Sequence, residues 1–281
     1  MREKYEFRIN EEHAHLLFGP EEGKRCGIIA RSITLFSDDE RFQEIGIIKK
    51  RMLRETGELF FFSWYLERGY TKKELAEASL FHLPVFARFE PTGEDCGTLY
   101  DESASCDICG AGARQLTPLR LPCRRIPKSR DIAKTIGGEL VVSQRFVDFC
   151  TAARATGITF HKIVDASSRP GLPAWYQFVP DSSLAEIIPP TRTGNNPFDE
   201  DERNEYRCSK GDTIGLNLLS EIFVRKQEAS WPDFVFSRQF VGRRGGFLRP
   251  EAQIIVSQRM GRLLATAGLR GCRLEVVRQR P

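Results

Sequence analysis

The chain has 281 residues, 41% of them hydrophobic and 28% charged, and its formal net charge is +4. This is ordinary globular usage, which excludes a disordered or fibrous chain. The longest apolar runs fall short of the roughly 20 residues that cross a bilayer, and the charged start MREKYEFRINEEHAH has no signal-peptide core. We therefore expect a cytoplasmic protein whose eight cysteines are mostly reduced thiols.

Residues 1–125 are expected to form an N-terminal α+β region made of charged, amphipathic segments. In YTKKELAEASLF, the spacing of Thr71 and Glu74 is that of a capping box, in which each side chain hydrogen-bonds the other residue's backbone N–H. This pattern predicts a helix over 72–81. The apolar run FFFSWYLER at 60–68 is expected in the core, either as a strand or as part of a helix.

A repeat is the strongest internal signal. The segment VVSQRFVDFCTAARATGITFHKIV (141–164) aligns without gaps with IVSQRMGRLLATAGLRGCRLEVVR (255–278), 114 residues later. Each copy has a β-branched run, a serine suited to cap a helix, about three helical turns, and a glycine that ends the helix before another strand. We therefore predict an α+β fold, a mixed sheet with helices built around two copies of a strand–helix–strand unit. The matching residues are Ser143 and Ser257, and Gly157 and Gly271.

The repeat suggests how the rest of the chain is organised. The first repeat unit is expected at 126–168 and the second at 233–281, packed either as one domain or as two. Residues 169–232 are rich in Pro, Gly, Asn and acidic residues, which predicts an irregular linker that also carries a second cysteine motif. An aspartate lies near the start of each unit, Asp131 in the first and Asp233 in the second.

One motif has the spacing of metal ligands. In Cys106-Asp-Ile-Cys109-Gly110 two thiolates can bind one ion while the glycine relieves the tight backbone turn, as in a zinc knuckle. A structural zinc ion needs four ligands, and the sequence has no second Cys-x-x-Cys pair. The nearest match is CSKGD, in which Cys208 is followed by Asp212 as an oxygen ligand.

We therefore predict a structural zinc ion, with Cys96 and Cys123 as reserve ligands. A metal-free, reduced knuckle and a redox-active cysteine pair are the alternatives. The predicted ligands are Cys106, Cys109, Cys208 and Asp212.

No catalytic constellation is recognisable in the sequence. The four histidines stand outside HExxH and Ser-His-Asp patterns, and His82, between SLF and LPVF, is expected in the core or at an interface. An enzyme of unrecognised type would use Asp131 and Asp233 as paired carboxylates, because they occupy equivalent repeat positions. We expect capping or turn roles for both aspartates, and a protein that is not an enzyme.

Positive charge is concentrated near the C-terminal end of the sequence. From Phe234 to Pro281 there are ten arginines and two glutamates, so this segment carries +8 and residues 1–233 carry −4. Such a surface can bind an acidic partner or phosphates. The simpler alternative is a solvated surface whose charges are compensated by nearby acidic residues. The predicted partner-binding residues are Arg238, Arg243, Arg244 and Arg249.

Several motifs together resemble a known family. GEDCGTLYDESASCDICGAGARQ, DIAKTIGGELVVSQRF with TGITF, YRCSKGDTIG and GRRGGFLRPEAQIIVSQRM are similar to segments of the double-CXXCG proteins, paralogues from myxobacteria and their relatives. The likeness spans roughly residues 90–280. This chain keeps the first CXXCG, at Cys106 and Cys109, whereas the second is reduced to Cys208 and Gly211.

Some members of that set, and a neighbouring group that shares the strand–serine–helix–glycine unit, are regarded as immunity proteins of polymorphic toxin systems. The resemblance implies a non-catalytic protein that neutralises a cognate toxin through a surface, with charge complementarity speeding capture. A zinc-containing nucleic-acid-binding protein is an alternative, because the same arginines and knuckle would suit it, and an unrecognised enzyme is another. No membrane partner is expected, and the sequence does not specify an oligomeric state.

Overall fold

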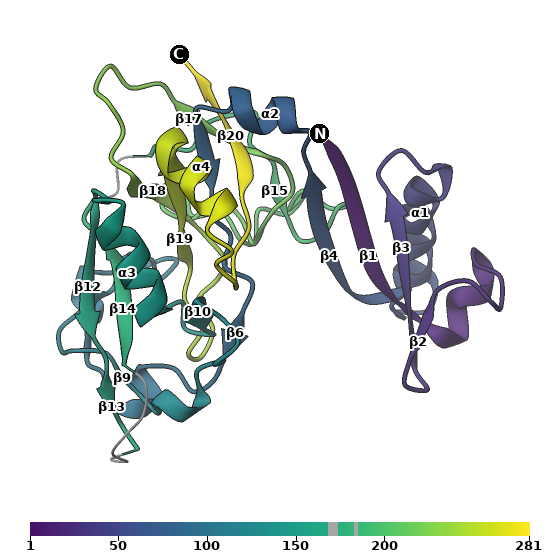
Figure 1. Ribbon diagram of the computed structural model, residues 1–281. Helices are drawn as coiled ribbons and strands as arrows, with labels where there is room; N and C mark the ends of the chain where they lie inside the picture. Colours follow the sequence, from purple (N-terminus) through teal and green to yellow (C-terminus); the bar gives the residue numbers. More distant parts are fainter. Residues whose placement is uncertain (168–173, 183–184) are drawn as a thin grey trace. The chain divides into compact units, whose positions relative to one another are not determined.

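The computed structural model divides into two compact units (Figure 1). The first unit is Met1–Ala76 with the short segment Asn196–Asp199, and the second is Glu77–Asn195 with Glu200–Pro281. Residues 77–125, which include the CXXCG knuckle, therefore lie in the second unit. The structure describes residues 1–167, 174–182 and 185–281.

The first unit is a four-stranded antiparallel sheet, in the order β2-β3-β1-β4, with one long helix packed against it. Strand β1 shows why one face is covered, because Tyr5, Phe7 and Ile9 alternate with exposed residues and are almost fully buried. The elements are β1 (Arg2–Asn10), β2 (Lys24–Cys26), β3 (Ala30–Phe36), α1 (Glu40–Glu55), β4 (Phe61–Gly69) and α2 (Lys72–Glu77), the last of which continues into the second unit.

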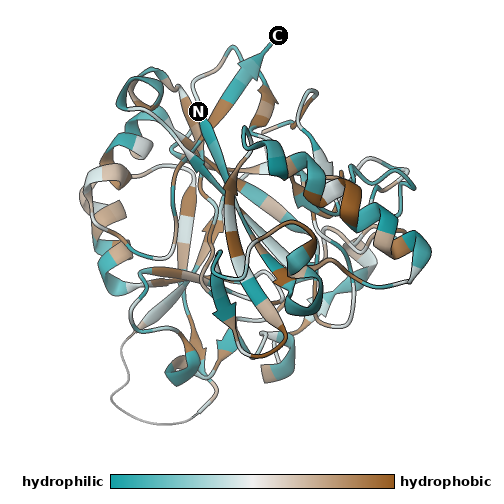
Figure 2. Ribbon diagram, turned by 90° about the vertical axis from the view of Figure 1, so that its right-hand side faces the viewer, coloured by the Kyte–Doolittle hydropathy of each residue, from teal (hydrophilic) through white to brown (hydrophobic). Residues whose placement is uncertain are grey.

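Helix α1 begins where Asp39 accepts a hydrogen bond from the backbone N–H of Arg41, at 3.0 Å. Its hydrophobic residues are interrupted by hydrophilic ones along its length, as Figure 2 shows, and only one side is buried. Phe198, from the short segment of this unit, packs against Phe7 and Phe42 at ring-centroid distances of 5.9 and 5.0 Å. Six of the fourteen buried residues in the core of the first unit are aromatic, and the others are aliphatic.

Two predictions about the N-terminal region have clear outcomes. The apolar run at 60–68 is a strand, β4, with Phe60 and Phe61 in the core. The capping box is confirmed, because the Thr71 hydroxyl accepts from the N–H of Glu74 (3.2 Å) and the Glu74 carboxylate accepts from that of Thr71 (2.8 Å). The helix is shorter than predicted and ends at Glu77, because the chain then enters a buried strand of the second unit.

The second unit is a mixed α/β structure with several sheets, which confirms the predicted combination of a mixed sheet with helices. Two sheets have five strands each, in the orders β12-β14-β11-β10-β6 and β17-β20-β5-β19-β18. In each of them four strands are antiparallel and one edge strand is parallel to its neighbour. The elements are β5 (Leu80–His82), β6 (Arg88–Phe89), β7 (Tyr100–Asp101), β8 (Arg114–Gln115), β9 (Arg120–Leu121), β10 (Ile132–Thr135), β11 (Leu140–Ser143), α3 (Gln144–Ala152), β12 (Ile158–Lys162), β13 (Val164–Asp165), β14 (Trp175–Pro180), β15 (Thr193–Gly194), β16 (Asn217–Leu218), β17 (Ile222–Arg225), β18 (Phe234–Val241), β19 (Glu251–Ser257), α4 (Gln258–Thr266) and β20 (Glu275–Arg280).

Both helices of the second unit begin at the serines that the sequence indicates, but they end before the predicted glycines. Helix α3 ends at Ala152 and α4 at Thr266, and the residues with positive φ that follow them directly are Arg154 and Gly268 rather than Gly157 and Gly271. Ser143 accepts from the backbone N–H of Phe146 at 3.3 Å, and Ser257 accepts from that of Met260 at 3.1 Å. Helix α3 contacts β11 and β14, and α4 contacts β19 and β5. Figure 1 shows α3 beside β14 and α4 beside β19. Each helix therefore covers one of the five-stranded sheets.

The segment 169–232 is predicted to be an irregular linker. The part of it that the structure describes contains the strands β14, β15, β16 and β17. Strand β14 lies inside a sheet between β11 and β12, with Trp175 and Phe178 buried. Its aromatic residues carry the signal for a strand, which the flanking prolines and glycines obscure. Among the described residues, no helix is long and apolar enough to cross a membrane.

Candidate metal centre

Two short loops of the second unit bring four potential metal ligands together. One sulfur each from Cys106, Cys109 and Cys208, and a carboxylate oxygen of Asp212, all lie within 4.8 Å of one another. The Sγ atoms of Cys106 and Cys208 are 3.6 Å apart, and Cys208 Sγ is 3.8 Å from Asp212 Oδ2. Sulfurs bound tetrahedrally to one zinc ion at about 2.3 Å would lie about 3.8 Å apart, so the spacing suits a single ion.

Each of the two loops is closed by an equivalent backbone hydrogen bond. The N–H of Cys106 donates to the carbonyl of Ala111, and the N–H of Cys208 donates to that of Thr213, each at 2.8 Å. Inside each loop a glycine with positive φ, Gly110 at +68° in the first, donates back to the carbonyl of the first cysteine. The sequence pattern Cys-x-x-Cys-Gly predicted a turn in the first loop. The second loop lacks the second cysteine and has the equivalent closing bond, although its glycine stands three residues after the cysteine rather than four.

Backbone N–H groups point at the sulfur atoms and control their protonation. Burial raises the pKa of the Cys208 thiol, but N–H groups of Lys210 and Asp212 and bonds from the other two thiols outweigh it, so the net shift is downward. The N–H of Cys109 lowers the pKa of Cys106, whereas its bond to Asp212 raises it, and the result is a pKa of about 11. The surroundings thus lower the pKa of Cys208 and raise that of Cys106.

This donor set fits a borderline-soft divalent ion such as zinc, because three thiol sulfurs and one carboxylate oxygen can fill a tetrahedral shell. The residues that would hold the ion are the four that the sequence indicated, and the structure brings all four together. Cys208 is buried and the other three are partly buried, so the ion would sit near the surface. The reserve ligands Cys96 and Cys123 lie outside this cluster.

Charged groups of the two loops and of the loop Gly242–Pro250, here called the arginine loop, surround the cluster. Lys210 pairs with Asp107 at 2.6 Å, which links the two metal-binding loops at their surface. The side chain of Arg244 packs against Gly110, where an added Cβ would lie 3.0 Å from its Cγ. The arginine loop therefore rests directly on the first metal-binding loop.

Of the four arginines predicted to bind a partner, Arg249 is the least exposed. It pairs with Glu94 at 2.8 Å and with Glu102 at 2.6 Å, and its guanidinium lies 4.5 Å from the ring centre of Tyr100. Arg244 also approaches Glu102, at 3.6 Å. Arg238 and Arg243 are exposed, and the side chain of Arg244 is 34% exposed.

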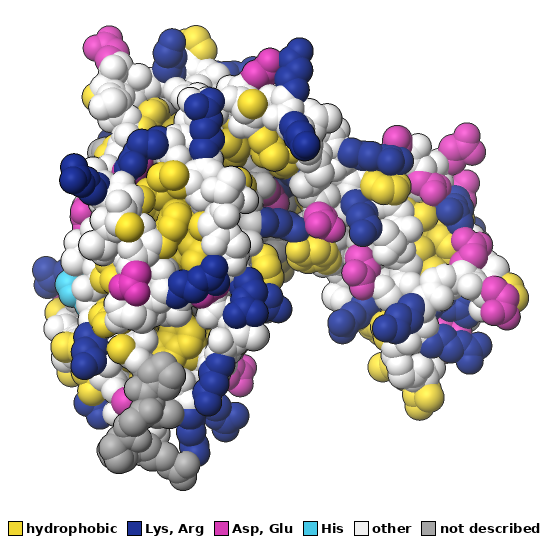
Figure 3. Space-filling model, in the orientation of Figure 1, with side chains coloured by type: hydrophobic (Ala, Val, Ile, Leu, Met, Phe, Trp, Pro, Cys, Tyr) yellow, Lys and Arg dark blue, Asp and Glu magenta, His cyan; other side chains and the backbone are white. Residues whose placement is uncertain are grey.

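Figure 3 shows Lys and Arg side chains spread over the visible face of the second unit, with hydrophobic side chains between them. The acidic residues near the first metal-binding loop compensate part of the positive charge of the C-terminal segment. The simpler interpretation of the arginines, an ion-paired surface, thus holds for Arg249 and partly for Arg244.

Sequence reasoning missed a buried polar group beside this network. Glu139 accepts hydrogen bonds from the Tyr100 hydroxyl (2.7 Å), the N–H of Gly93 (3.0 Å) and the hydroxyl of Thr135. Burial and this carboxylate raise the pKa of Tyr100 well above its ordinary value. The glycine-rich sequence GGEL marks the turn but carries no sign that its glutamate points inward.

The histidines and aspartates flagged in the sequence lie apart from the metal cluster. His82 is buried in β5, where its Nε2 is 3.1 Å from Gln253 Oε1, as expected of a core histidine. His161 is exposed on β12. Asp131 and Asp233 are each hydrogen-bonded to the serine that caps the following helix, at 3.2 and 2.8 Å, so each supports a cap without being the capping residue itself.

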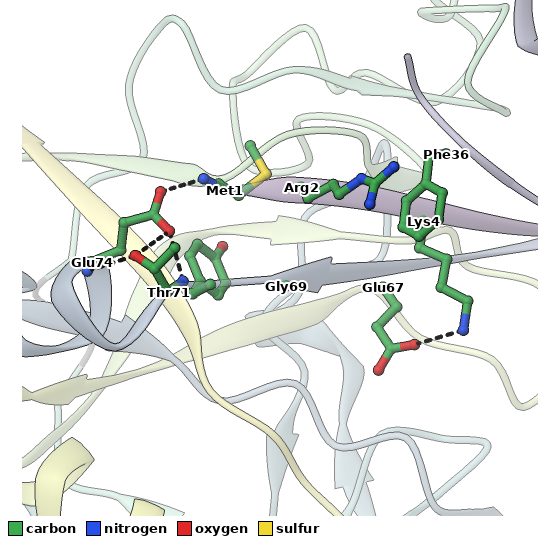
Figure 4. A pocket seen from close by; sticks show the side chains of 9 residues that line it. Met1, Arg2, Lys4, Phe36, Glu67, Gly69, Thr71 and Glu74 are labelled. Carbon is green, nitrogen blue, oxygen red and sulfur yellow. Dashed lines mark hydrogen bonds and ion pairs between the residues drawn. The ribbon is translucent and has the colours of Figure 1, made fainter. Parts of the chain in front are cut away.

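A separate hollow of about 650 Å³ opens on the first unit (Figure 4). Lys4 pairs with Glu67 across it at 3.9 Å, Glu74 is bonded to Thr71, and the guanidinium of Arg2 lies 3.5 Å from the ring centre of Phe36. Each of these charged side chains already has a partner inside the hollow, which distinguishes it from the convergent donors of the metal cluster.

No family model matches the chain, and a search of curated proteins finds no similar sequence.

Proposed function

We propose that the chain is a non-catalytic, cytoplasmic binding protein of the bacterial immunity type, with one structural zinc ion in its second unit. The observation that carries the zinc ion is the convergence of three thiols and one carboxylate within 4.8 Å. Four protein ligands make a closed structural site, whereas a catalytic zinc keeps one position for water or substrate. The ion would tie together loops that are 102 residues apart in the sequence.

Metal analysis of the purified full chain tests this site. We expect one zinc ion per chain after purification without added chelator, and a lower unfolding midpoint in urea once a chelator has removed it. A chain that is purified and dialysed against zinc, contains none, and unfolds at the same midpoint with and without a chelator would contradict the structural site.

The proposed partner is a protein toxin with an acidic surface. Arg238 and Arg243, which are exposed, and Arg244, which is partly exposed, supply positive charge. The motifs shared with the double-CXXCG proteins support the immunity role. Charge complementarity of this kind raises the rate of association and suppresses wrong partners. The genes next to the one that encodes this chain are the place to look for the toxin.

Co-expression tests the partner. Cells that express a toxic neighbouring gene product should survive when this chain is also made, and the two proteins should co-purify. The double variant Arg243→Glu/Arg244→Glu should slow capture by tenfold or more at low salt, within the roughly 10–1000-fold range of electrostatic steering. The matched control is Arg124→Glu/Arg125→Glu, which reverses two exposed arginines elsewhere and should leave capture unchanged. Failure to bind any neighbouring product would contradict the immunity role.

One observation favours nucleic acid as the alternative partner. The arginine loop also exposes Phe247, which is 45% accessible and could stack on a base. Binding to random single-stranded DNA with a steep loss of affinity at higher salt would support that alternative. Absence of retention on heparin at low salt would remove it.

We also propose that the two strand–helix–strand segments are copies of one ancestral unit. Three features support this: the capping serines, the equal length of α3 and α4, and the glycines that follow them, Gly157 and Gly271, both with positive φ. Independent origin would require the same cap, the same helix length and the same following glycine to arise twice at one spacing.

A further inference from the structure

The two five-stranded sheets contain the same four-stranded block. One block has the order β12-β14-β11-β10 and the other β20-β5-β19-β18, and every neighbouring pair in both is antiparallel. The registers also agree. Tyr176 lies opposite Val142 and Lys162, while Phe81 lies opposite the residues 114 positions later, Val256 and Val276. Tyr176 and Phe81 therefore hold equivalent places.

The strand at that place comes from a different part of the chain in each block. In the first block it is β14, which follows β12 in the sequence. In the second block it is β5, which precedes all the other strands of both blocks. If β5 is the first strand of one copy and β14 the first strand of the next, then each copy places its first strand in the other copy's sheet.

Equivalence also extends to the metal-binding loops. Cys106 and Asp131 are each 102 residues before their counterparts, Cys208 and Asp233, and the two loops are closed by the same backbone bond. Short strands after the loops behave alike, since β9 pairs in parallel with β13 and β17 pairs in parallel with β20. The number of residues between equivalent positions of the two copies increases from 102 before the arginine loop to 114 after it. The arginine loop joins β18 to β19 and is longer than the equivalent turn between β10 and β11.

Two equivalent sets of hydrogen bonds, here called latches and centred on Asp131 and Asp233, join the two copies. Asp131 accepts from the capping Ser143, from Arg145 (3.1 Å) and from the backbone N–H of Arg270 in the other copy (2.9 Å). Arg145 also donates to the carbonyl of Ala267 at the end of α4, at 2.9 Å. The side chain of one copy thus caps the helix end of the other.

The second latch has the equivalent bonds, made by residues of the second copy to the first copy. Asp233 accepts from Ser257, from Arg259 Nε (3.2 Å) and from the backbone N–H of Thr156 in the first copy (3.0 Å). Arg259 donates to the carbonyl of Ala153 at the end of α3, at 2.9 Å. Residues 156 and 153 are 114 positions before 270 and 267, so the contacts obey a two-fold exchange.

We propose that the second unit is an internal pseudo-dimer: two copies, 77–167 and 174–281 without 196–199, exchange their first strands and bind one metal ion between them. The statement about the ion rests on the zinc site proposed above. Each copy supplies one loop, with Cys106 and Cys109 from the first and Cys208 and Asp212 from the second. The ion therefore acts as a clasp that links the two copies. Each copy's interface binds the other copy.

A cut between the copies tests the inference on the whole chain. A protease site replaces residues 168–173, and the purified full-length protein is cut in zinc-containing buffer. Phe198 of the second piece packs into the core of the first unit and could hold the pieces together by itself, so the cut is also made in Phe198→Ala. We expect both pieces to elute as one species from size exclusion in both backgrounds. Separation of the pieces in native buffer would overturn the strand exchange.

The metal is tested on the same cut protein. Its urea midpoint should rise with protein concentration, as for any two-chain complex, and should fall when a chelator is added or when Cys208 is changed to serine. If the cut complex binds one zinc ion and its midpoint ignores a chelator, the shared clasp is wrong although the zinc site exists. If the complex holds together and binds no zinc, the metal site proposed above fails and the strand exchange stands.

Discussion

The carboxylate of Asp131 accepts a hydrogen bond from the backbone N–H of Arg270, 139 residues later, at 2.9 Å. The counterpart bond runs from the N–H of Thr156 to Asp233, at 3.0 Å. Each aspartate is buried and is also bonded to a serine and an arginine, so its lone pairs are already in use within the fold. Both residues hold the polypeptide together at the point where two similar segments meet.

Changing Asp233 to alanine should destabilise the second unit by about 2–4 kcal/mol, because it removes a buried acceptor and leaves the partner groups of Thr156 and Arg259 unsatisfied. Urea unfolding followed by circular dichroism measures the change. The control is Asp148→Ala, an exposed aspartate on α3, which should stay within about 0.5 kcal/mol of the parent. Equal effects of the two variants would contradict the role given to Asp233.

The same latch should make stability depend on acid. Burial raises the pKa of Asp233, but Arg259, Ser257 and the N–H of Thr156 outweigh it, so the pKa in the folded protein is lowered. An aspartate in the unfolded chain titrates near about 3.9. The stability contributed by a carboxylate with a depressed pKa is complete above that value and is lost as the pH falls through the folded pKa.

Wild type and Asp233→Asn should therefore differ most in unfolding free energy near pH 7, and the difference should shrink at pH 3. Urea titrations at both pH values, with Asp148→Asn as the reference substitution, measure this. A difference that stays constant over the interval would show that the charge of Asp233 does not contribute.

The metal cluster makes a selective prediction among the cysteines. Cys106→Ser, Cys109→Ser and Cys208→Ser should each abolish stoichiometric zinc binding, because each removes a thiolate ligand. Cys26→Ser, which changes a free thiol of the first unit, should bind zinc like the parent. Cobalt substitution gives the measurement, since thiolate-to-cobalt absorption reports the number of sulfur ligands. Loss of metal from the Cys26 variant would mean that the zinc is held elsewhere.

The fourth ligand should set how tightly the metal is held. Asp212→Cys supplies a fourth sulfur and should raise zinc affinity, whereas Asp212→Ala should lower it by more than the roughly 10–100-fold seen when an outer-shell partner is removed. Competition with a chromogenic chelator measures both. Unchanged affinity in Asp212→Ala would show that the carboxylate is not a ligand and that the site has three protein donors.

Some of this architecture follows directly from local sequence. The serine caps, the capping box at Thr71 and the turn around Cys106 are all set by residues within five positions of one another, and all three form as their patterns indicate. The zinc ligands could also be predicted, because the pattern at Cys208 keeps one thiol and has a carboxylate, Asp212, four residues later. Local chemistry of this kind needs no knowledge of the fold.

Other features depend on long-range pairing that local patterns do not encode. Strand β5 has only three residues, and nothing in Leu80–His82 specifies that it lies between β19 and β20. The relation between the two metal-binding loops is hidden because Gly211 stands where a second cysteine would fall and because the arginine loop changes the spacing. Phe198, among acidic residues, gives no sign that it completes the core of the first unit.

Gly271 gives the sharpest test of the contact between the similar segments. Its φ is +114°, and a Cβ there would lie 1.9 Å from the carbonyl oxygen of Ile132, in the other segment. Gly271→Ala should therefore cost about 3 kcal/mol or more, from backbone strain together with overpacking against main-chain atoms that cannot move aside.

The control is Gly246→Ala, which also has positive φ (+54°) but open space around the added methyl group, so it should cost about 1–2 kcal/mol from conformation alone. Urea unfolding of the two variants separates the terms. Gly157→Ala should match Gly271→Ala, because its Cβ would lie 2.2 Å from the carbonyl oxygen of Phe234. If all three variants cost the same, the glycines serve only to allow a positive φ; a larger cost at Gly157 and Gly271 means that they also let one segment's backbone approach the other's.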